Sequence, residues 1–350
     1  HRPPRYETVG RWAIRSISAF GRRLAPMDAA PVIRAEGLVK HFGQIEAVRG
    51  VDLAIRPGEI FGFLGPNGAG KTTTINILRP TAGRAWVAGL DVIRHPAAVR
   101  TRIGLVFQDP SLDEQLTGRE NLEFHAFIYD VPSALRWQRI PEVLEMVELS
   151  DRADSLVRTY SGGMRRRLEI ARGILHTPDV LFLDEPTLGL DPQTRRHIWR
   201  YLLELPKRTG TTIFMTTHYM DEAEFCDRIA IIDAGRIVAL GTPDELKAMV
   251  GGDVITLSTL DNVTAAREIG ERFEVAPIAD DGTLRIEVAD GAAFVPRLVR
   301  ELGVPVSTVT LRRPSLDDVF LKLTGHAIRE EEASSKDQLR MMGHRWRGHR

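Results

Sequence analysis

Residues 65–73 read Gly65-Pro66-Asn67-Gly68-Ala69-Gly70-Lys71-Thr72-Thr73 and directly follow the apolar run Ile60–Leu64. Residues 65–72 fit G-x-x-x-x-G-K-[ST], a loop whose backbone N–H groups surround a nucleotide's phosphates. Glycines let the backbone approach the phosphates closely, the lysine reaches their oxygens, and Thr72 holds Mg²⁺. The alternative is a Gly-rich turn without a ligand, which the strand before the loop and the helical stretch after it disfavour. The sequence therefore predicts a nucleotide's phosphate site here.

Composition narrows the class of protein. The 350 residues allow two domains, and 47 basic against 47 acidic residues give no argument for nucleic acid. No run approaches the roughly 18 apolar residues that a membrane span needs, so a membrane process would require a separate membrane partner. Cys226 is the only cysteine, which excludes an internal disulfide and suits a reducing cytosol.

Two segments before the phosphate loop show the alternation of β-strands. Val32–Val39 and Ala47–Ile55 lie on either side of a turn and predict an antiparallel pair. Phe42 is expected in the loop between them, where a phenylalanine taken alone is usually core or surface filler.

Three later apolar runs end in polar residues: Ile103–Phe107 before Gln108, Val180–Leu183 before Asp184 and Glu185, and Thr212–Met215 shortly before His218. Near-continuous apolar strands indicate a parallel sheet that is covered on both faces. Ligands of such sheets bind beyond the carboxyl ends of the strands. We therefore expect these polar residues to converge on the phosphate loop.

Each of these polar residues suits phosphoryl transfer. Asp184 matches the acid that holds Mg²⁺ with Thr72, and Glu185 matches a group that orients or deprotonates the attacking water. Gln108 would sense Mg²⁺ and water, and His218 would bond the γ-phosphate or its leaving oxygen. The alternatives are a strand-end cap for Asp184, a surface carboxylate for Glu185, and ordinary polar loop residues for the others. Their common placement favours the functional interpretation.

A helical insertion is predicted between Gln108 and Asp184. Thr117 and Glu120 form a capping box, and the insertion ends at Ser161-Gly162-Gly163 before the basic stretch Met164–Arg172. Ser161 is a natural N-cap, and the two glycines leave the amides of the helix start accessible. One alternative is a capped helix with a basic face. The other, which we favour, is a second site for an anion.

Together these segments resemble the nucleotide-binding subunit of an ATP-binding cassette (ABC) transporter over about residues 31–250. The matches are the phosphate loop Gly65–Thr73, the glutamine loop at Gln108, the Ser161-Gly162-Gly163 element, the metal acid Asp184 with the catalytic base Glu185, the dimer-contact loop Leu188–Asp191, and the switch histidine His218. An aromatic residue at the position of Phe42 stacks on adenine in this family. The resemblance implies ATP and Mg²⁺ as ligands. It also implies a head-to-tail homodimer in which Ser161-Gly162-Gly163 of one subunit closes on the γ-phosphate held by the other.

Two features depart from the common family pattern. Tyr160 and Met164 flank the Ser-Gly-Gly element in place of Leu and Gln, a form similar to the daunorubicin-resistance-type exporter ATPases of actinobacteria. The helix after Lys71 has only Thr72–Arg79 before Pro80, about one turn less than in relatives. We expect activity to survive the first departure and the second to reduce the buried core.

The domain prediction follows from these patterns. Residues 31–250 are expected to form an α/β P-loop NTPase domain of the ABC ATPase type, with a mixed core sheet, an antiparallel β subdomain and a helical insertion. Residues 251–326 are expected to form a small α+β regulatory or accessory domain with a ferredoxin-like βαββαβ order. Its expected elements are strands Val254–Ser258, Phe273–Ile278, Thr283–Val288 and Val306–Leu311, helices Asn262–Ile269 and Ala292–Glu301, and a final helix Val319–Leu323.

The two ends of the sequence are expected to lie outside these domains. Residues 1–30 form an Arg-rich leader, interpreted either as a transit peptide or surface helix or, as we favour, as an extension before a working start at Met27. Residues 327–350 are polar and charged and predict a disordered tail.

The combined pattern predicts an ATP-hydrolysing subunit of a two-component exporter. It is expected at the cytoplasmic face of the membrane as a peripheral subunit, with a separate multi-span permease and no nucleic acid as partner. The resemblance suggests a hydrophobic drug, such as an anthracycline-like antibiotic, as cargo. One alternative is a cassette ATPase acting on ribosomes or DNA, which usually has two cassettes or a long coiled insertion. A second is a nucleotide-gated interaction module without turnover, against which Glu185 and His218 argue.

Overall fold

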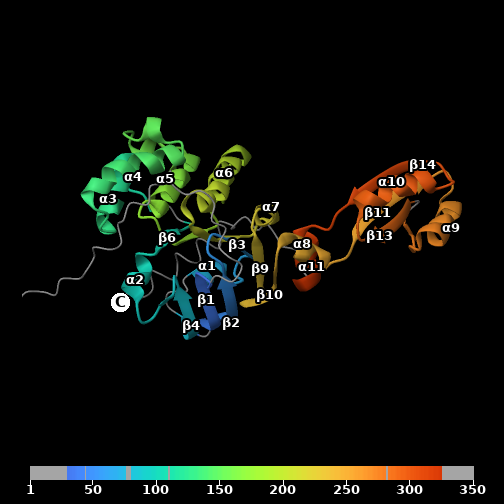
Figure 1. The fold of residues 1–350 in the computed structure, drawn as a ribbon, viewed down its shortest axis with the longest axis horizontal. Coiled ribbons are helices and arrows are strands. Elements are labelled where there is room, and N and C mark those ends of the chain that lie inside the picture. Colours follow the sequence, from blue (N-terminus) through green and yellow to red (C-terminus); the bar gives the residue numbers. More distant parts are fainter. Residues whose placement is uncertain (1–29, 44, 76–79, 109–110, 281–282, 325–350) are drawn as a thin grey trace, which may run out of the picture. The chain divides into compact units, whose positions relative to one another are not determined.

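The computed structural model describes residues 30–43, 45–75, 80–108, 111–280 and 283–324. The chain forms two compact units, divided between Met249 and Val250. Figure 1 labels the elements of both units. The predicted tail, 327–350, and residues 1–29 of the predicted leader lie outside the described residues.

The first unit contains a six-stranded sheet in the order β10-β9-β3-β8-β7-β6, which we call the core sheet. Its strands are β3 (Ile60–Leu64), β6 (Ile103–Val106), β7 (Val180–Asp184), β8 (Thr212–Thr217), β9 (Arg228–Asp233) and β10 (Arg236–Gly241). Neighbouring strands run parallel, except that β10 is antiparallel to β9. Every residue of β3, β7 and β8 is buried, which confirms the predicted sheet covered on both faces. The carboxyl ends of β3, β6, β7 and β8 therefore share one edge.

The same unit contains an antiparallel sheet in the order β2-β1-β4-β5. Its strands are β1 (Ile33–Phe42), β2 (Ile45–Ile55), β4 (Ala82–Val87) and β5 (Leu90–Asp91). The predicted antiparallel pairing is confirmed, with Ile33 opposite Ile55. The expectation of a loop position for Phe42 is wrong, because β1 and β2 stay paired up to Phe42 and Ile45.

The predicted helical insertion lies between β6 and β7. It consists of α3 (Gly118–Ile128), α4 (Ser133–Met146), the short 3-10 helices η2 (Ser150–Arg152) and η3 (Val157–Thr159), and α5 (Gly162–Ile174). The capping box at Thr117 and Glu120 is confirmed by reciprocal backbone contacts. In Figure 1, α3, α4 and α5 lie together on the side of the first unit opposite β1, β2 and β4.

The other helices of this unit follow strands of the two sheets. They are α1 (Lys71–Ile75), α2 (Pro96–Arg100), α6 (Pro192–Thr209), α7 (Met220–Ala223) and α8 (Pro243–Ala248). Helix α1 begins at the lysine of the phosphate loop. Residues 76–79 lie outside the described residues, so the effect of a short helix there stays a prediction.

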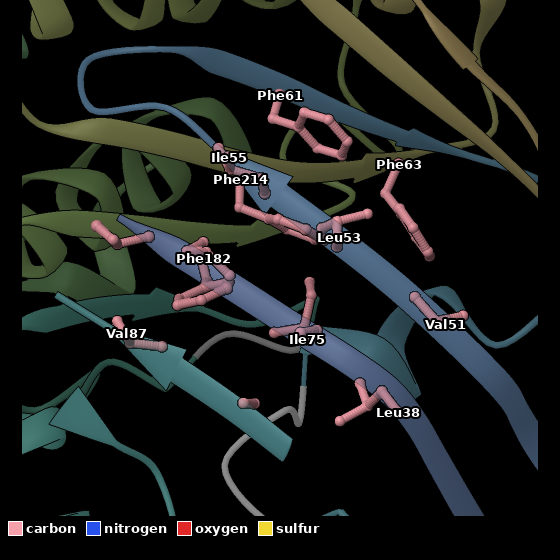
Figure 2. Close-up of a cluster of buried hydrophobic side chains, with 14 of the residues drawn as sticks. Leu38, Val51, Leu53, Ile55, Phe61, Phe63, Ile75, Val87, Phe182 and Phe214 are labelled. Carbon is pink, nitrogen blue, oxygen red and sulfur yellow. The ribbon is translucent and has the colours of Figure 1, made fainter. Parts of the chain in front are cut away.

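Aromatic side chains form the centre of the core of the first unit (Figure 2). The ring centroid of Phe214 lies 5.8 Å from that of Phe61, 5.6 Å from that of Phe63 and 5.4 Å from that of Phe182. Aliphatic side chains of the antiparallel sheet belong to the same cluster, among them Leu38, Val51, Leu53, Ile55 and Val87. This shared core joins the two sheets and fixes the strand ends beyond it.

The second unit has a four-stranded antiparallel sheet in the order β12-β13-β11-β14. Its elements are β11 (Asp253–Thr259), α9 (Asn262–Phe273), β12 (Ile278–Asp280), β13 (Thr283–Val288), α10 (Gly291–Glu301), β14 (Val306–Arg312) and α11 (Leu316–Thr324). The chain order and the strand order confirm the ferredoxin-like arrangement.

One predicted strand of this unit is misplaced. Phe273–Ile278 is not a strand, because Phe273 is the last residue of α9 and packs in the core with Ala265 and Ile269 at helical spacing. Glu274 then ends the helix with a φ of +56°. Only Ile278–Asp280 pairs with β13.

Phe214→Ala is expected to lower the free energy of unfolding of the first unit by about 3–5 kcal/mol, because it removes a buried ring from the centre of the core. Phe124→Ala removes a ring that is 61% exposed and should change stability by less than about 0.5 kcal/mol. Urea unfolding followed by tryptophan fluorescence measures both, since this unit contains Trp86, Trp137 and Trp199. Equal losses for the two variants would contradict this account of the core.

Candidate functional site

The phosphate loop connects β3 to α1. Gly68 and Gly70 have φ values of +82° and +102°, which residues with a Cβ rarely adopt. A Cβ on Gly65 would lie 2.5 Å from the carbonyl oxygen of Ile232, and one on Gly70 would lie 2.4 Å from that of Ala47. The loop therefore requires glycine at these positions and forms the close backbone cradle that phosphates need.

Lys71 is buried at the start of α1, with 5% of its surface exposed. Its Nζ donates to the carbonyl oxygens of Gly65 at 2.8 Å and Pro66 at 3.2 Å. The same atom lies 3.2 Å from Oε1 of Glu185. Burial lowers the pKa of Lys71, and the charge of Glu185 partly offsets this shift. Three oxygen atoms thus contact the buried ammonium.

Glu185 directly follows β7 and has a φ of +44°. Nδ1 of His218 donates to Oε1 of Glu185 at 3.1 Å, so this oxygen contacts both His218 and Lys71. Burial raises the pKa of Glu185, but the hydrogen bond from His218 and the charge of Lys71 outweigh it, and the net shift is downward. A strained φ in a non-glycine residue is typical of functional positions. We call Lys71, Glu185 and His218 the Lys71 cluster.

Asp184 lies next to this cluster as the last residue of β7, and it is buried. Its Oδ1 accepts a hydrogen bond from Oγ1 of Thr216 at 2.5 Å. The same hydroxyl oxygen accepts from the backbone N–H of Glu185 at 3.1 Å. Thr216 of β8 therefore fixes the end of β7 from the neighbouring strand.

The predicted Mg²⁺ ligands are Thr72, which is exposed in the first turn of α1, Asp184, and Gln108, which is exposed just beyond β6. Among the described residues, no group of three or more His, Cys, Asp and Glu side chains could hold a metal ion by itself. One hydroxyl and one carboxylate fit Mg²⁺ that is held mainly by phosphate oxygens, as is usual for this ion.

Gln108 and Phe42 are not members of the Lys71 cluster, and both are exposed. Gln108 lies just beyond β6 and is exposed, and the described residues show no side-chain hydrogen bond from it to the cluster. Phe42 is 54% exposed, and Nζ of Lys40 lies 5.3 Å from its ring centroid. The predicted roles of Gln108 and Phe42 stay predictions.

The Ser161-Gly162-Gly163 element opens α5, as its N-cap pattern predicts. Oγ of Ser161 accepts from the backbone N–H of Met164 at 3.3 Å. Ser161 and Gly162 are exposed, and space around Gly162 is open. Gly163 faces α6, where an added Cβ would lie 2.4 Å from Cγ2 of Thr194. The exposed amides of this helix start can receive an anion.

Tyr160, one of the departures from the family pattern, is a packed anchor. It is 4% exposed, and its hydroxyl donates to the carbonyl oxygen of Arg152 at 2.6 Å. A Cβ on Gly118 would lie only 2.4 Å from this hydroxyl. The aromatic ring therefore holds the start of α5 against the rest of the helical insertion.

Asp191 has a local structural role in addition to its predicted dimer contact. Its carboxylate accepts from the backbone N–H groups of Gln193 and Thr194, each at 3.0 Å, and so caps α6. Hydrogen bonds from the hydroxyl and then the backbone N–H of Thr194 lower the pKa of Asp191, and the N–H of Gln193 adds to this shift. The loop Leu188–Asp191 thus ends in a fixed position.

Sequence reasoning missed two buried charged residues beside the site, Arg166 of α5 and Glu222 of α7. Glu222 accepts hydrogen bonds from the hydroxyls of Thr187 and Thr217, the latter at 2.8 Å. Thr187 follows Glu185 by two residues and Thr217 precedes His218, so Glu222 fastens the loops after β7 and β8. In the sequence it is one acid among Asp221, Glu222 and Glu224, which suggests a solvated face.

The fold and the site define an ATP-binding cassette, a P-loop ATPase domain with a helical insertion. The family model described as ABC transporter matches residues 48–188, and the model described as ATP-binding protein DrrA1-3-like, C-terminal domain, matches residues 241–324. The daunorubicin resistance ATP-binding protein DrrA2 of Streptomyces coeruleorubidus is 45% identical over 314 residues, covering 86% of this chain and 97% of that protein. The chain belongs to the ABC transporter family as an ATP-hydrolysing subunit.

Two further similarities bear on function. The Nod factor export ATP-binding protein I of Ralstonia nicotianae is 40% identical, over 87% of this chain and 97% of that protein. A solved dimeric structure of an ATP-binding cassette in a post-hydrolysis state, bound to ADP and Pi, is similar with a TM-score of 0.55 and 30% identity. It covers 60% of this chain and 98% of that one.

Glu222→Gln is expected to raise the melting temperature more at about pH 8 than at about pH 5. Burial raises the pKa of Glu222, so folded-state stability is lost as pH rises from the ordinary glutamate pKa through the raised one. Glutamine does not ionise, so the variant avoids the loss of stability that ionised Glu222 causes at the higher pH. Any change in stability from altered hydrogen bonds should be the same at both pH values. Glu224→Gln, at a more exposed position, is the matched control. A Glu222→Gln effect that is the same at both pH values would contradict the assignment.

Proposed function

We propose that this ATPase works as a head-to-tail homodimer on a separate multi-span permease and exports a hydrophobic drug from the cytoplasmic face of the membrane. The observation that carries the proposal is the pair of half-sites in one chain. One is the phosphate loop with the Lys71 cluster, and the other is the exposed helix start at Ser161 and Gly162.

The residues present fit ATP and Mg²⁺. Backbone amides of the glycine-rich loop would hold the phosphates, Lys71 would bind the β and γ oxygens, and Phe42 would stack on adenine. Thr72 and Asp184 would hold Mg²⁺, with Gln108 joining them from the end of β6. ATP supplies the phosphoryl group, and Mg²⁺ neutralises charge on its oxygens.

Glu185 is the proposed general base. Its lowered pKa keeps the carboxylate ionised at neutral pH, as proton removal from water requires. A γ-phosphate competes with Glu185 for Lys71, because both anions lie within reach of one ammonium. When Lys71 turns to phosphate, Glu185 loses a positive neighbour and becomes more basic. The pair therefore links ATP binding to activation of the base.

His218 holds Glu185 through Nδ1–H, which leaves Nε2 for another ligand. A neutral imidazole with the proton on Nδ1 accepts at Nε2, whereas the imidazolium donates there. His218 would bond the γ-phosphate or its leaving oxygen through Nε2.

The homodimer supplies the second half of each site. Ser161-Gly162-Gly163 of one subunit would bind the γ-phosphate held by the other, with Asp191 in the contact loop between them. The similar cassette of known structure is dimeric and bound to ADP and Pi. One subunit alone would then bind ATP and hydrolyse it poorly.

A separate permease is proposed because, among the described residues, no helix is long and apolar enough to cross a membrane. The helical insertion carries exposed apolar side chains suited to contact with such a partner: Phe124, Phe127, Ile128 and Trp137.

The relatives are named for daunorubicin resistance and for Nod factor export, so their names support export of different compounds. An anthracycline-like antibiotic is the cargo we propose. For the C-terminal unit we propose regulation, dimer support or coupling to the permease.

Glu185→Gln is expected to lower steady-state ATP turnover at least about 100-fold, because the amide cannot accept the proton of the attacking water. ATP affinity should persist, since the phosphate loop is unchanged. Phosphate release measures turnover, and a fluorescent ATP analogue measures binding. Glu114→Gln removes a surface carboxylate, 56% exposed, and serves as the control. Normal turnover in Glu185→Gln would show that Glu185 is not the base.

A further inference from the structure

Arg166 of α5 contacts the backbone at the ends of two strands of the core sheet. Its side chain is 8% exposed, and the guanidinium donates to four carbonyl oxygens. Nη1 donates to Phe107 at 2.5 Å and Nε to Pro186 at 2.7 Å. Nη2 donates to Asp184 at 2.8 Å and to Glu185 at 3.2 Å. One planar side chain thus joins the residue before Gln108 to the backbone of the proposed base.

Glu169 completes this arrangement. It is 1% exposed, and Oε2 accepts from Nη1 of Arg166 at 3.0 Å, which neutralises the buried guanidinium. Its other oxygen, Oε1, accepts from the backbone N–H of Ser111 at 2.8 Å. Arg172, one turn further along α5, donates to the carbonyl oxygen of Ser111 at 2.8 Å and to its hydroxyl at 2.5 Å. Helix α5 therefore contacts Phe107, directly before Gln108, and Ser111, three residues after it.

The start of the same helix is the half-site for the partner's nucleotide. Ser161 precedes Arg166 by five positions, which is about 7.5 Å along a rigid helix. A shift of Ser161 or Gly162 must move Arg166, and with it the carbonyl groups of Asp184 and Glu185. The helix thus connects the half-site that a subunit offers to its partner with the half-site that it keeps.

We propose that Arg166 is a positioning residue that holds the two half-sites of one subunit in a fixed relation. It places the Ser161 start of α5 for the partner's ATP and, at the same time, the backbone of Glu185 and that of Phe107, next to Gln108, for the subunit's own ATP. This inference rests on the proposed head-to-tail dimer. Lysine cannot replace Arg166, because a single ammonium lacks the planar fork that reaches carbonyl groups on two strand ends.

The test uses pairs of differently tagged full-length chains in which one subunit carries Gly162→Asp. The space around Gly162 accepts a side chain, and the added carboxylate repels a γ-phosphate. A wild-type chain paired with Gly162→Asp is the reference, because it keeps one complete site. The complete site of the reference combines the Glu185 half of the Gly162→Asp chain with the Ser161 half of the wild-type chain. In the first test pair, Arg166→Lys is added to the Gly162→Asp chain, so within the complete site it affects only the Glu185 half. In the second test pair, Arg166→Lys is placed on the other chain, so within the complete site it affects only the Ser161 half.

Both test pairs are expected to lose turnover by about 10-fold or more relative to the reference, since small misplacements of reacting groups have effects of this size. The KM for ATP should stay within about twofold, because Arg166 does not contact the phosphate loop. If either test pair equals the reference, Arg166 does not position both halves and the inference is wrong. Adding Glu185→Gln to the Gly162→Asp chain of the reference pair should abolish its turnover, because in a head-to-tail dimer that chain supplies the Glu185 half of the complete site; surviving turnover would overturn the head-to-tail dimer itself, and this inference with it.

Two additional variants separate positioning from loss of folding. Arg167→Lys changes the next residue of α5, whose Nη1 donates to the carbonyl oxygens of Val147 and Glu148 instead, and should leave both pairs at the reference rate. Glu169→Gln keeps the shape of the partner of Arg166 but removes its charge, and it should reproduce the turnover loss if Arg166→Lys does not fold. Normal turnover in folded Glu169→Gln pairs, together with an Arg166→Lys chain that does not fold, would reduce Arg166 to a stability role and overturn the inference.

Discussion

The buried ammonium of Lys71 imposes the condition on which the rest of the site depends. A charge with 5% exposure needs oxygen ligands on every side, and they come from the loop carbonyls and from Glu185. Glu185 reaches Lys71 from the end of β7, which pairs with β8, which in turn pairs with β3 behind the loop. The parallel register of these three strands therefore sets the spacing of the charged pair, and the aromatic core around Phe214 holds that register.

The same edge of the sheet is stabilised by charges that never reach the nucleotide. Arg166 and Glu222 are both buried, and each satisfies polar groups in loops that follow strands of the core sheet. Loops beyond strand ends have no ladder partners, so their carbonyl and hydroxyl groups need other ligands. A buried ionic side chain has several hydrogen-bond donors or acceptors and can satisfy several of these loop groups. The loops that follow β6 and β7 therefore owe their position to side chains from α5 and α7.

Much of the fold could be predicted from local patterns, and the exceptions have a common cause. The glycine-rich loop, the apolar strands with polar ends, and the cap at Ser161 each show in a few consecutive residues. Phe42 and Phe273 were assigned wrongly because strand pairing and core packing decide where those elements end. Arg166 sits in the run Arg165–Arg167, and nothing local shows that only the middle guanidinium turns inward. The one available signal was Glu169, an acid at i+3.

The departure at Tyr160 is best understood together with Arg166. Tyr160 anchors the start of α5 to the helical insertion through the carbonyl of Arg152, and Arg166 anchors the next turn to the core sheet. Between them lies the exposed Ser161-Gly162 start, which has no buried side chain of its own. Its position is therefore set from both sides by groups that belong to different parts of the first unit. Tyr160, in place of the leucine common in the family, changes the first anchor but not the backbone amides at the start of α5. We therefore expect the family's phosphate contacts to persist in this chain.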